Sequence, residues 1–367
     1  MVKSNNNILD LADKFDIFFF DAFGVLWNGT SFFDGALASL KKLIDMGKTV
    51  FILSNSTKVS DDARKSYLKH GLIKNIHYNE IITSGEYLRF VLLNKKLSFK
   101  QNKDPKNYYC FGKNNKKLFE GTKYNIVNNL DEADFIYLSS LSLTKEDFEK
   151  APDNLKKYFV RLKESKDESY RATNLELLLP KIDEIIVKSG LPVLSGNPDL
   201  TALVGVLESD EPVSIITSGS VAEYLQNRNV EVVEVGKPHI EIFEFALSKL
   251  EKYVVKVNKE KICMVGDTLR TDIKGANNIG IKSVLCVATG ITAEALKNGC
   301  KLNNLVVQSN TSVDYTIKGV GFLLINNFKE KYDGKENDNK KHFLGCWWSI
   351  SKFKPCLLLL YKKSSYV

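Results

Sequence analysis

Short apolar runs alternate with amphipathic segments along the first part of the chain. Residues 16–21 (DIFFFD) and 49–56 (TVFILSNS) are apolar runs of the length that buried strands have. Between them apolar residues recur with a helical period, and Gly47 follows as a stop signal. The periodic positions are Ala36, Leu37, Leu40, Leu43 and Ile44. The pattern predicts a β-α-β unit, and residues 61–72 add a further helix, which Gly71 ends.

The same alternation returns in the last part of the chain. Runs with strand character at 230–236, 261–267 and 282–290 alternate with helical segments at 239–253 and 271–280. Such alternation predicts an α/β fold whose core is a doubly wound parallel sheet, similar to a Rossmann fold. Ligands of these sheets bind at the carboxyl ends of the strands.

A long middle stretch, residues 83–232, has strands and a helix of its own. Its expected elements are strands at 107–112, 133–140 and 191–197 and a helix at 175–190. We therefore expect a second α/β domain inserted into the first. The core then consists of residues 1–82 and 233–328, and its two halves meet across the insertion.

The overall charge of the chain is carried mostly by its last segment. The 367 residues have a formal net charge of +8, of which residues 329–367 supply +5 from nine Lys and four acids. We expect a polar linker and tail of unknown role there, because a dense run of mixed charge buries little apolar surface. No stripe of Arg interleaved with aromatic residues accompanies the charge, so nucleic acid is not an expected partner.

The cysteines and the apolar runs bear on the compartment. Six cysteines lie far apart, without a CxxC pair or a His at zinc-ligand spacing. Neither a disulfide framework nor a structural zinc site is indicated. No apolar run reaches the roughly 18 residues of a membrane span, and residues 1–16 lack the apolar core of a signal peptide. We expect a cytoplasmic protein with no membrane insertion.

Polar residues stand directly after several of the expected strands. They are Asp21, Ser54, Asn55, Lys237 and Asp267, with Asp272 five residues beyond the last of these. If the strands are parallel, these residues gather at one edge of the sheet. Carboxylates there suit Mg²⁺, and a hydroxyl and an ammonium suit a phosphoryl group. Each residue alone also fits a helix cap or a turn, so the joint pattern carries the hypothesis, with Asp21 as a nucleophile.

Several stretches resemble one known family, the haloacid dehalogenase-like hydrolases, and within it class IIA, the p-nitrophenyl phosphatase-like group. The matching stretches are DAFGVLWNG, FILSNSTK, GKPHIEIFEFAL and VGDTLRTDIKGANNIGIKSVLCVATG, with SGNPDL in the insertion and DYTIKGVGFLL as the closing strand and helix of the core. The resemblance covers about residues 14–328. It implies that the inserted domain is a cap over the active site.

The resemblance also implies a role for each candidate residue. Asp21 is the nucleophile and a ligand of Mg²⁺, together with the backbone carbonyl of Phe23 and the Asp267 carboxylate, and Asp272 supports the metal site. Ser54, Asn55 and Lys237 hold the phosphoryl group, and Ser54 and Lys237 count as catalytic for that reason. In the cap, Asn197 and Asp199 are candidate substrate-binding residues.

Phe23 departs from the pattern of the family. Phosphatases of the family usually carry a second Asp at this position, which protonates the leaving oxygen and then activates water. General acid–base help of this kind is typically worth ~10²–10⁴ in rate. His239 and Asp199 are candidates to take over the role, although a His at a helix start is commonly only a polar surface residue, and Asn-Pro-Asp is equally a turn.

The resulting hypothesis is a Mg²⁺-dependent phosphatase of a small phosphorylated metabolite, which acts through an aspartyl-phosphate. Two alternatives stay open because of Phe23. One is a non-hydrolytic protein that keeps the site for binding phosphate or a metabolite. The other is a phosphonate or haloacid hydrolase on the same fold. A homodimer is compatible with the sequence, which does not decide the oligomeric state.

Overall fold

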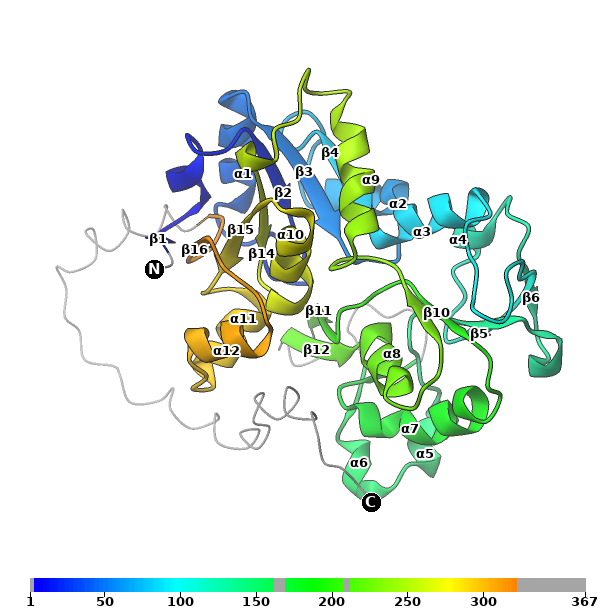
Figure 1. The fold of residues 1–367 in the computed structure, drawn as a ribbon. Coiled ribbons are helices and arrows are strands. Elements are labelled where there is room, and N and C mark those ends of the chain that lie inside the picture. The colour runs from blue at the N-terminus through cyan, green and yellow to red at the C-terminus, as the bar shows by residue number, and fades with distance from the viewer. Residues whose placement is uncertain (1–2, 162–168, 207–211, 322–367) are drawn as a thin grey trace, which may run out of the picture.

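Two sheets of different size organise the chain in the computed structural model (Figure 1). The structure describes residues 3–161, 169–206 and 212–321. The expected closing helix of the core, after residue 321, and the tail 329–367 lie outside the described residues. No helix of the described ranges is long and apolar enough to cross a membrane.

The larger sheet has seven strands, and all its neighbouring pairs are parallel. Their order across the sheet is β1 (Lys3–Asn5), β16 (Tyr315–Ile317), β15 (Lys282–Cys286), β14 (Ile262–Gly266), β2 (Ile17–Phe20), β3 (Thr49–Ser54) and β4 (Glu80–Thr83). The sequence order reverses at β2, because the chain runs from β2 to β4 on one side and from β14 to β16 on the other. This reversal is the switch point at which α/β sheets open a crevice for ligands.

Alternate residues of the central strands pack into two different layers. Phe18 and Phe20 of β2 face a cluster formed with α1 (Ala36–Asp45), α2 (Ser60–Leu68) and the 3₁₀ helix η1 (Ile8–Leu11). Ile17 and Phe19 face a cluster formed with α9 (Ile240–Leu250) and α10 (Lys274–Ile279). The period of two explains why the strand is apolar throughout: both of its faces are covered. The doubly wound α/β core is confirmed.

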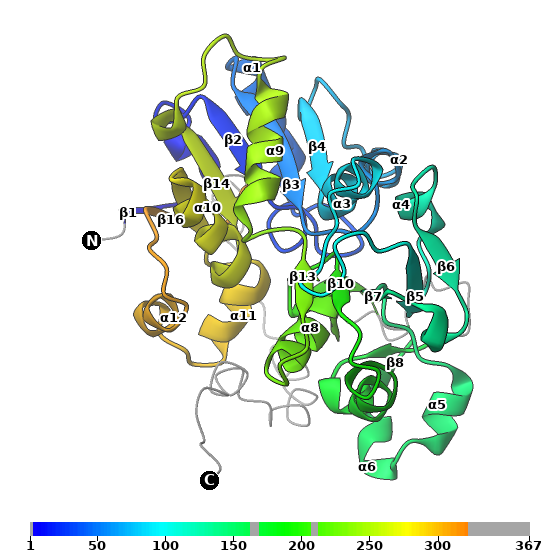
Figure 2. The same cartoon turned by 45° about the vertical axis from the view of Figure 1, so that its right-hand side comes forward.

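The smaller sheet is built from the middle of the chain. Five parallel strands lie in the order β13 (Val232–Glu234), β10 (Val193–Ser195), β7 (Phe135–Leu138), β5 (Asn107–Phe111) and β6 (Asn125–Val127). Two antiparallel pairs accompany them, β11 (Thr201–Val206) with β12 (Pro212–Ile216) and β8 (Phe159–Val160) with β9 (Arg171–Ala172). Figure 2 shows this sheet and its helices beside the edge of the larger sheet at which β3 ends.

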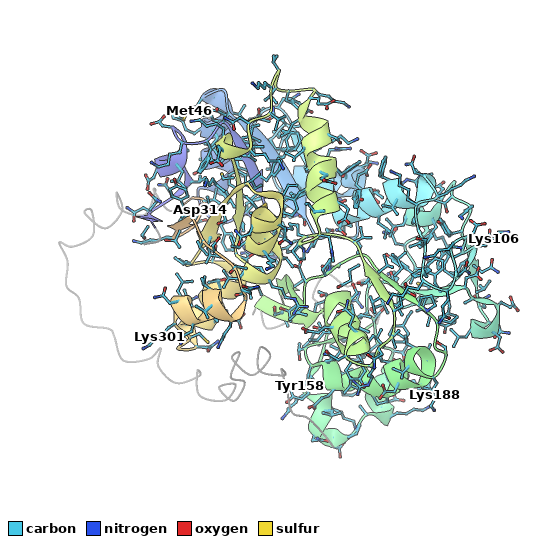
Figure 3. The ribbon with its side chains drawn as sticks, in the orientation of Figure 1. Met46, Lys106, Tyr158, Lys188, Lys301 and Asp314 are labelled. Atoms are coloured by element: carbon cyan, nitrogen blue, oxygen red, sulfur yellow. The ribbon has the colours of Figure 1, made fainter. Side chains whose placement is uncertain are left out.

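The remaining helices are mostly short. They are α3 (Ser84–Leu93), α4 (Lys116–Phe119), η2 (Leu130–Glu132), α5 (Lys145–Lys150), α6 (Asp153–Lys156), η3 (Leu175–Leu177), α7 (Leu179–Lys181), η4 (Ile182–Val187), α8 (Ser218–Gln226), η5 (Lys259–Lys261), η6 (Leu269–Ile273), α11 (Gly290–Lys297) and α12 (Leu302–Gln308). In Figure 3, Met46 lies on the outer surface of the larger unit, and Lys106 and Lys188 lie on the outer surface of the smaller one.

The structure corrects two expectations about elements. The run at 230–236 was expected in the core sheet, but β13 pairs with β10 in the smaller sheet, so this expectation is wrong. The helix expected at 175–190 is a succession of 3₁₀, α and π turns. Pro180 lies in the second of these turns. Its ring removes a backbone donor, so a regular α-helix does not run through this position from the preceding turn.

Candidate active site

Three of the predicted polar residues leave the core sheet at the same edge. Asp21 follows the last residue of β2, Ser54 is the last residue of β3, and Asp267 follows the last residue of β14. Because the three strands are adjacent and parallel, their carboxyl ends lie side by side. The backbone N–H of Asp21 donates to the carbonyl of Val265 at 2.9 Å, which continues the pairing of β2 with β14 up to the site.

Asp272, which lies in η6, is close to Asp21 and Asp267. One carboxylate oxygen from each of Asp21, Asp267 and Asp272 lies within 4.8 Å of the others. Asp272 is fully buried, and its second oxygen accepts the Thr268 N–H at 3.1 Å, which fixes the carboxylate. Three convergent oxygens from carboxylates are the donor set that a hard divalent cation such as Mg²⁺ prefers.

Two glycines, neither of them among the predicted site residues, let the backbone approach Asp267 closely. A Cβ added to Gly290 would lie 2.0 Å from Oδ2 of Asp267, and one added to Gly24 would lie 2.4 Å from the same atom. Both glycines have a positive φ. The Ile291 N–H donates to this oxygen at 2.6 Å. Gly24 also brings the loop that contains the Phe23 carbonyl against the carboxylate cluster.

Lys237 lies at the centre of the charged cluster. Its Nζ donates to Oδ1 of Asp21 and to Oδ1 of Asp272, both at 2.7 Å. The lysine side chain is 1% exposed. A buried ammonium is stable only with such partners, and here it offsets part of the negative charge of the carboxylates. A phosphoryl group that replaces one of these contacts would meet the same ammonium.

The carboxylates and the lysine shift one another. Burial raises the pKa of Asp21 to about 7, with further increases from Asp272 and Asp199, while Lys237 lowers it. Burial also raises the pKa of Asp267 well above its usual range. The pKa of Lys237 is raised because the neighbouring carboxylates outweigh its own burial. The cluster therefore has more negative charge than its lysine balances, as expected where a cation binds.

Ser54 and Asn55 have different surroundings. The Ser54 hydroxyl is buried and accepts the Ser56 N–H at 3.3 Å. Asn55 uses its whole amide within the protein: Oδ1 accepts the Lys237 N–H at 2.7 Å, and Nδ2 donates to the Lys237 carbonyl and to Oδ1 of Asp199, both at 3.0 Å. The Asn55 side chain thus braces Lys237 and has no free amide hydrogen for a phosphoryl oxygen.

The two candidate residues of the cap, Asn197 and Asp199, also differ in their contacts. Asp199 reaches the core and contacts Asn55, whereas the Oδ1 atom of Asn197 accepts the Asp199 N–H at 3.0 Å in a local turn. His239, the other candidate for proton transfer, precedes the first residue of α9, and its side chain makes no capping bond there.

Phe23 does not replace the missing carboxylate with another polar group. Its ring is half-buried and packs against the core cluster that contains Phe18 and Phe20. The loop is closed by the Gly24 N–H, which donates to the Trp27 carbonyl at 2.8 Å. Phe23 therefore contributes apolar packing to this loop.

Two sequence-family models match the chain. A sequence model described as haloacid dehalogenase-like hydrolase matches residues 18–125, and one described as HAD-hydrolase-like matches residues 234–309. The two matches contain all the core residues of the site. The chain belongs to the haloacid dehalogenase-like hydrolases. Its cap, inserted after β4 and built on a parallel sheet of its own, places it in class IIA of this family.

Two curated relatives match this chain over about nine-tenths of their own length. A 4-nitrophenylphosphatase of Schizosaccharomyces pombe is 26% identical over 80% of this chain and 90% of its own. Phosphoglycolate phosphatase 2 of Arabidopsis thaliana is 27% identical over 80% of this chain and 89% of its own. The crystal structure of a haloacid dehalogenase-like hydrolase from Brucella suis shares the fold, with a TM-score of 0.63, 21% identity, and coverage of 86% and 99% of the two chains.

Proposed function

We propose that this protein is a Mg²⁺-dependent phosphoric monoester hydrolase that acts on a small phosphorylated metabolite. The observation that carries the proposal is the contact of Lys237 with both Asp21 and Asp272 beside a third buried carboxylate. An ammonium next to a nucleophilic carboxylate and a cation site suits phosphoryl transfer. The two phosphatases named among the relatives support the same class of reaction.

Asp21 is the nucleophile of the proposed reaction. Its Oδ attacks phosphorus while the bond to the leaving oxygen breaks, which gives an aspartyl-phosphate and the free alcohol once this oxygen takes up a proton. Water then attacks phosphorus, the bond to Asp21 breaks, and inorganic phosphate leaves. Lys237 and the Ser54 hydroxyl hold the phosphoryl oxygens and stabilise the charge that develops on them.

Asp21, Asp267, Asp272 and the Phe23 carbonyl would hold Mg²⁺, which neutralises phosphoryl charge when it is bound. Without the ion, burial keeps the pKa of Asp21 high and makes the carboxylate a weaker nucleophile near neutral pH. Lys237 counteracts this effect through its direct contact. The proposed role of Asn55 is to position Lys237, since its amide is fully engaged.

Turnover of p-nitrophenyl phosphate with Mg²⁺ and with EDTA tests this proposal. We expect release of nitrophenol with Mg²⁺ and a loss of most of it with EDTA. The packing of Phe23 in place of an acid favours a second candidate, a protein that binds phosphate without hydrolysing it. Tight binding of inorganic phosphate without turnover would support that candidate. Turnover confined to phosphonates or haloacids would support the other alternative, a phosphonate or haloacid hydrolase on the same fold.

A further inference from the structure

One loop of the cap, residues 197–200, is held by three hydrogen bonds from its own domain. Hydroxyl groups at the start of α8 donate to carbonyls of the loop. They are Ser218 to Asn197 at 3.2 Å, Ser220 to Leu200 at 2.7 Å, and Thr217 to Asp199. A Cβ at Gly219 would lie 2.2 Å from the Asp199 carbonyl, so the helix start lies directly against the loop. The backbone of Asp199 is therefore fixed relative to the cap.

The side chain of Asp199 leaves this loop toward the core. Its Oδ1 atom accepts from Nδ2 of Asn55 at 3.0 Å. Asn55 follows the last residue of β3. One cap carboxylate thus contacts the core residue that directly follows Ser54, a proposed phosphoryl-binding residue.

The side chain of Asn55, which contacts Asp199, also bonds to the backbone of Lys237. Its Oδ1 atom accepts the Lys237 N–H and its Nδ2 atom donates to the Lys237 carbonyl, so the amide holds both sides of one residue of the backbone. Gly236 makes the approach feasible: a Cβ there would lie 2.7 Å from Oδ1 of Asn55 and 2.8 Å from Cδ of Pro198. Cap loop, core amide and lysine backbone meet at this one point.

We propose that Asp199 is a positioning residue, which couples closure of the cap to placement of the Lys237 ammonium through Asn55. The inference rests on the proposed function, because it assigns Lys237 to the phosphoryl group. When the cap is closed, Asp199 fixes the amide plane of Asn55, and this amide fixes the backbone of Lys237. When the cap opens, Asn55 loses a charged acceptor and the lysine backbone loses its brace.

Two variants of Asp199 distinguish its role as a hydrogen-bond acceptor from its role as a charged or acidic group. Asp199→Asn keeps an oxygen that accepts from Asn55, whereas Asp199→Ala removes the acceptor. A proton-transfer role for Asp199 would instead make the two variants equally defective. Glu223→Gln is the matched control, since Glu223 in the cap pairs with Arg270 in the core at 2.8 Å on a half-exposed surface, away from Asn55.

The first measurement needs neither substrate nor metal. Hydrogen exchange of the Lys237 amide reports its bond to Asn55 directly. We expect about tenfold faster exchange in Asp199→Ala, the size of one lost hydrogen bond to a charged group, and little change in Asp199→Asn and Glu223→Gln. Unchanged exchange in a folded Asp199→Ala would overturn the coupling, whatever the activity of the wild type.

The second measurement uses inorganic phosphate with Mg²⁺ as the probe. We expect binding to weaken about tenfold in Asp199→Ala, with a rise in KM for p-nitrophenyl phosphate that exceeds the change in kcat. Asp199→Asn should stay within about threefold of the wild type. A kcat that falls in Asp199→Asn for alkyl but not aryl esters would overturn the proposal and identify Asp199 as the proton donor. A wild type that neither binds phosphate nor turns over would contradict the proposed function, while the exchange result would still test the brace.

Discussion

The core sheet and the cap sheet have the same construction and different chemistry at their carboxyl edges. Both consist of adjacent parallel strands. At the core edge the first residues after β2 and β14 are Asp21 and Asp267. At the cap edge β7 is followed by Ser139, whose hydroxyl donates to the carbonyl of Lys113. The core edge gathers charge, whereas Ser139 at the cap edge bonds to the backbone of its own domain.

The comparison shows that the topology supplies a place but not a function. The carboxyl ends of parallel strands always lie at the same edge of a sheet. The function of that edge therefore depends on which side chains are there and on whether these side chains are free to bind a ligand. In the core, the carboxylates have one buried lysine between them and stay short of positive charge. In the cap, Asp199 makes its contact with the core and not with its own sheet.

The largest expected effect is that of removing the nucleophile from the core edge. Asp21→Asn should lower the turnover of p-nitrophenyl phosphate by at least about 10⁴-fold, because the amide does not attack phosphorus. Circular dichroism should show an unchanged fold. Asp183→Asn is the matched change in the cap, where Asp183 accepts from the Tyr224 hydroxyl at 2.8 Å, and should leave turnover intact. Equal activity of both variants would contradict the proposed mechanism.

Phe23→Asp should add to the core edge the general acid that it lacks. A carboxyl two residues beyond Asp21 would assist departure of a basic leaving oxygen, whereas nitrophenolate departs without help. The rate on alkyl phosphates should rise by up to ~10²–10⁴, less what the lost ring packing costs, and the rate on aryl phosphates should change little. Both ester classes are measured in both proteins, with thermal unfolding as the check on the fold.

Two outcomes of that experiment would count against the reading of Phe23. An equal change for alkyl and aryl esters would mean that proton transfer does not limit the reaction. A loss for alkyl esters in a variant that is still folded would mean that another residue already donates the proton.

The contribution to stability should depend on pH with opposite sign for Asp21 in the core and Asp147 in the cap. Burial raises the pKa of Asp21 from 3.8 to about 7, so without metal its contribution to stability is full below about pH 4 and is lost as pH rises to about 7. In the cap, Asp147 is partly buried, but hydrogen bonds from Lys181 and Thr144 lower its pKa. Its contribution is present above the ordinary pKa and is lost as pH falls.

Thermal unfolding with EDTA and with Mg²⁺ at pH 5 and pH 8 measures this difference. Because the ion binds the ionised carboxylates, the gain in Tm from Mg²⁺ should be larger at pH 8. A shift of one pKa unit corresponds to a free-energy difference of about 1.4 kcal/mol between the two protonation states. In Asp21→Asn the gain should shrink at pH 8, and in Asp147→Asn it should not. An equal gain at both pH values would show that Asp21 is ionised without metal.

Much of the core could be predicted from the sequence because its strands are buried on both faces. Phe18, Phe19 and Phe20 read as one apolar run, and the acids after such runs mark the strand ends. The assignment of β13 failed because a run such as VEVVEVG looks the same in either sheet. Its partner, β10, lies almost 40 residues earlier, and local pattern does not reveal pairing at that distance.

The finer parts of the site depended on approach distances that no residue pattern contains. Asn55 was expected, from the resemblance to the family, to hold the phosphoryl group, and in the structure its side-chain amide is used by Lys237 and Asp199. Gly24 and Gly290 matter only because Asp267 lies against them. A glycine in sequence shows freedom of the backbone and not what it lies against.

Gly290→Ala should give the smallest effect, and it tests whether the core edge needs this close approach. The new methyl group would lie 2.0 Å from Oδ2 of Asp267, so the carboxylate must move and the affinity for Mg²⁺ should fall about tenfold or more. Gly47→Ala is the matched control: its φ of +75° equals that of Gly290 within a few degrees, and nothing lies within 4 Å of the added atom. Both variants should lose about 1 kcal/mol of stability from the strained backbone, and Gly290→Ala should lose more because its new methyl group displaces Asp267. Mg²⁺ titration followed by calorimetry separates them, because only Gly290→Ala should bind the ion more weakly. Equal affinities in the two variants would mean that Asp267 does not hold the metal in the position that the structure gives it.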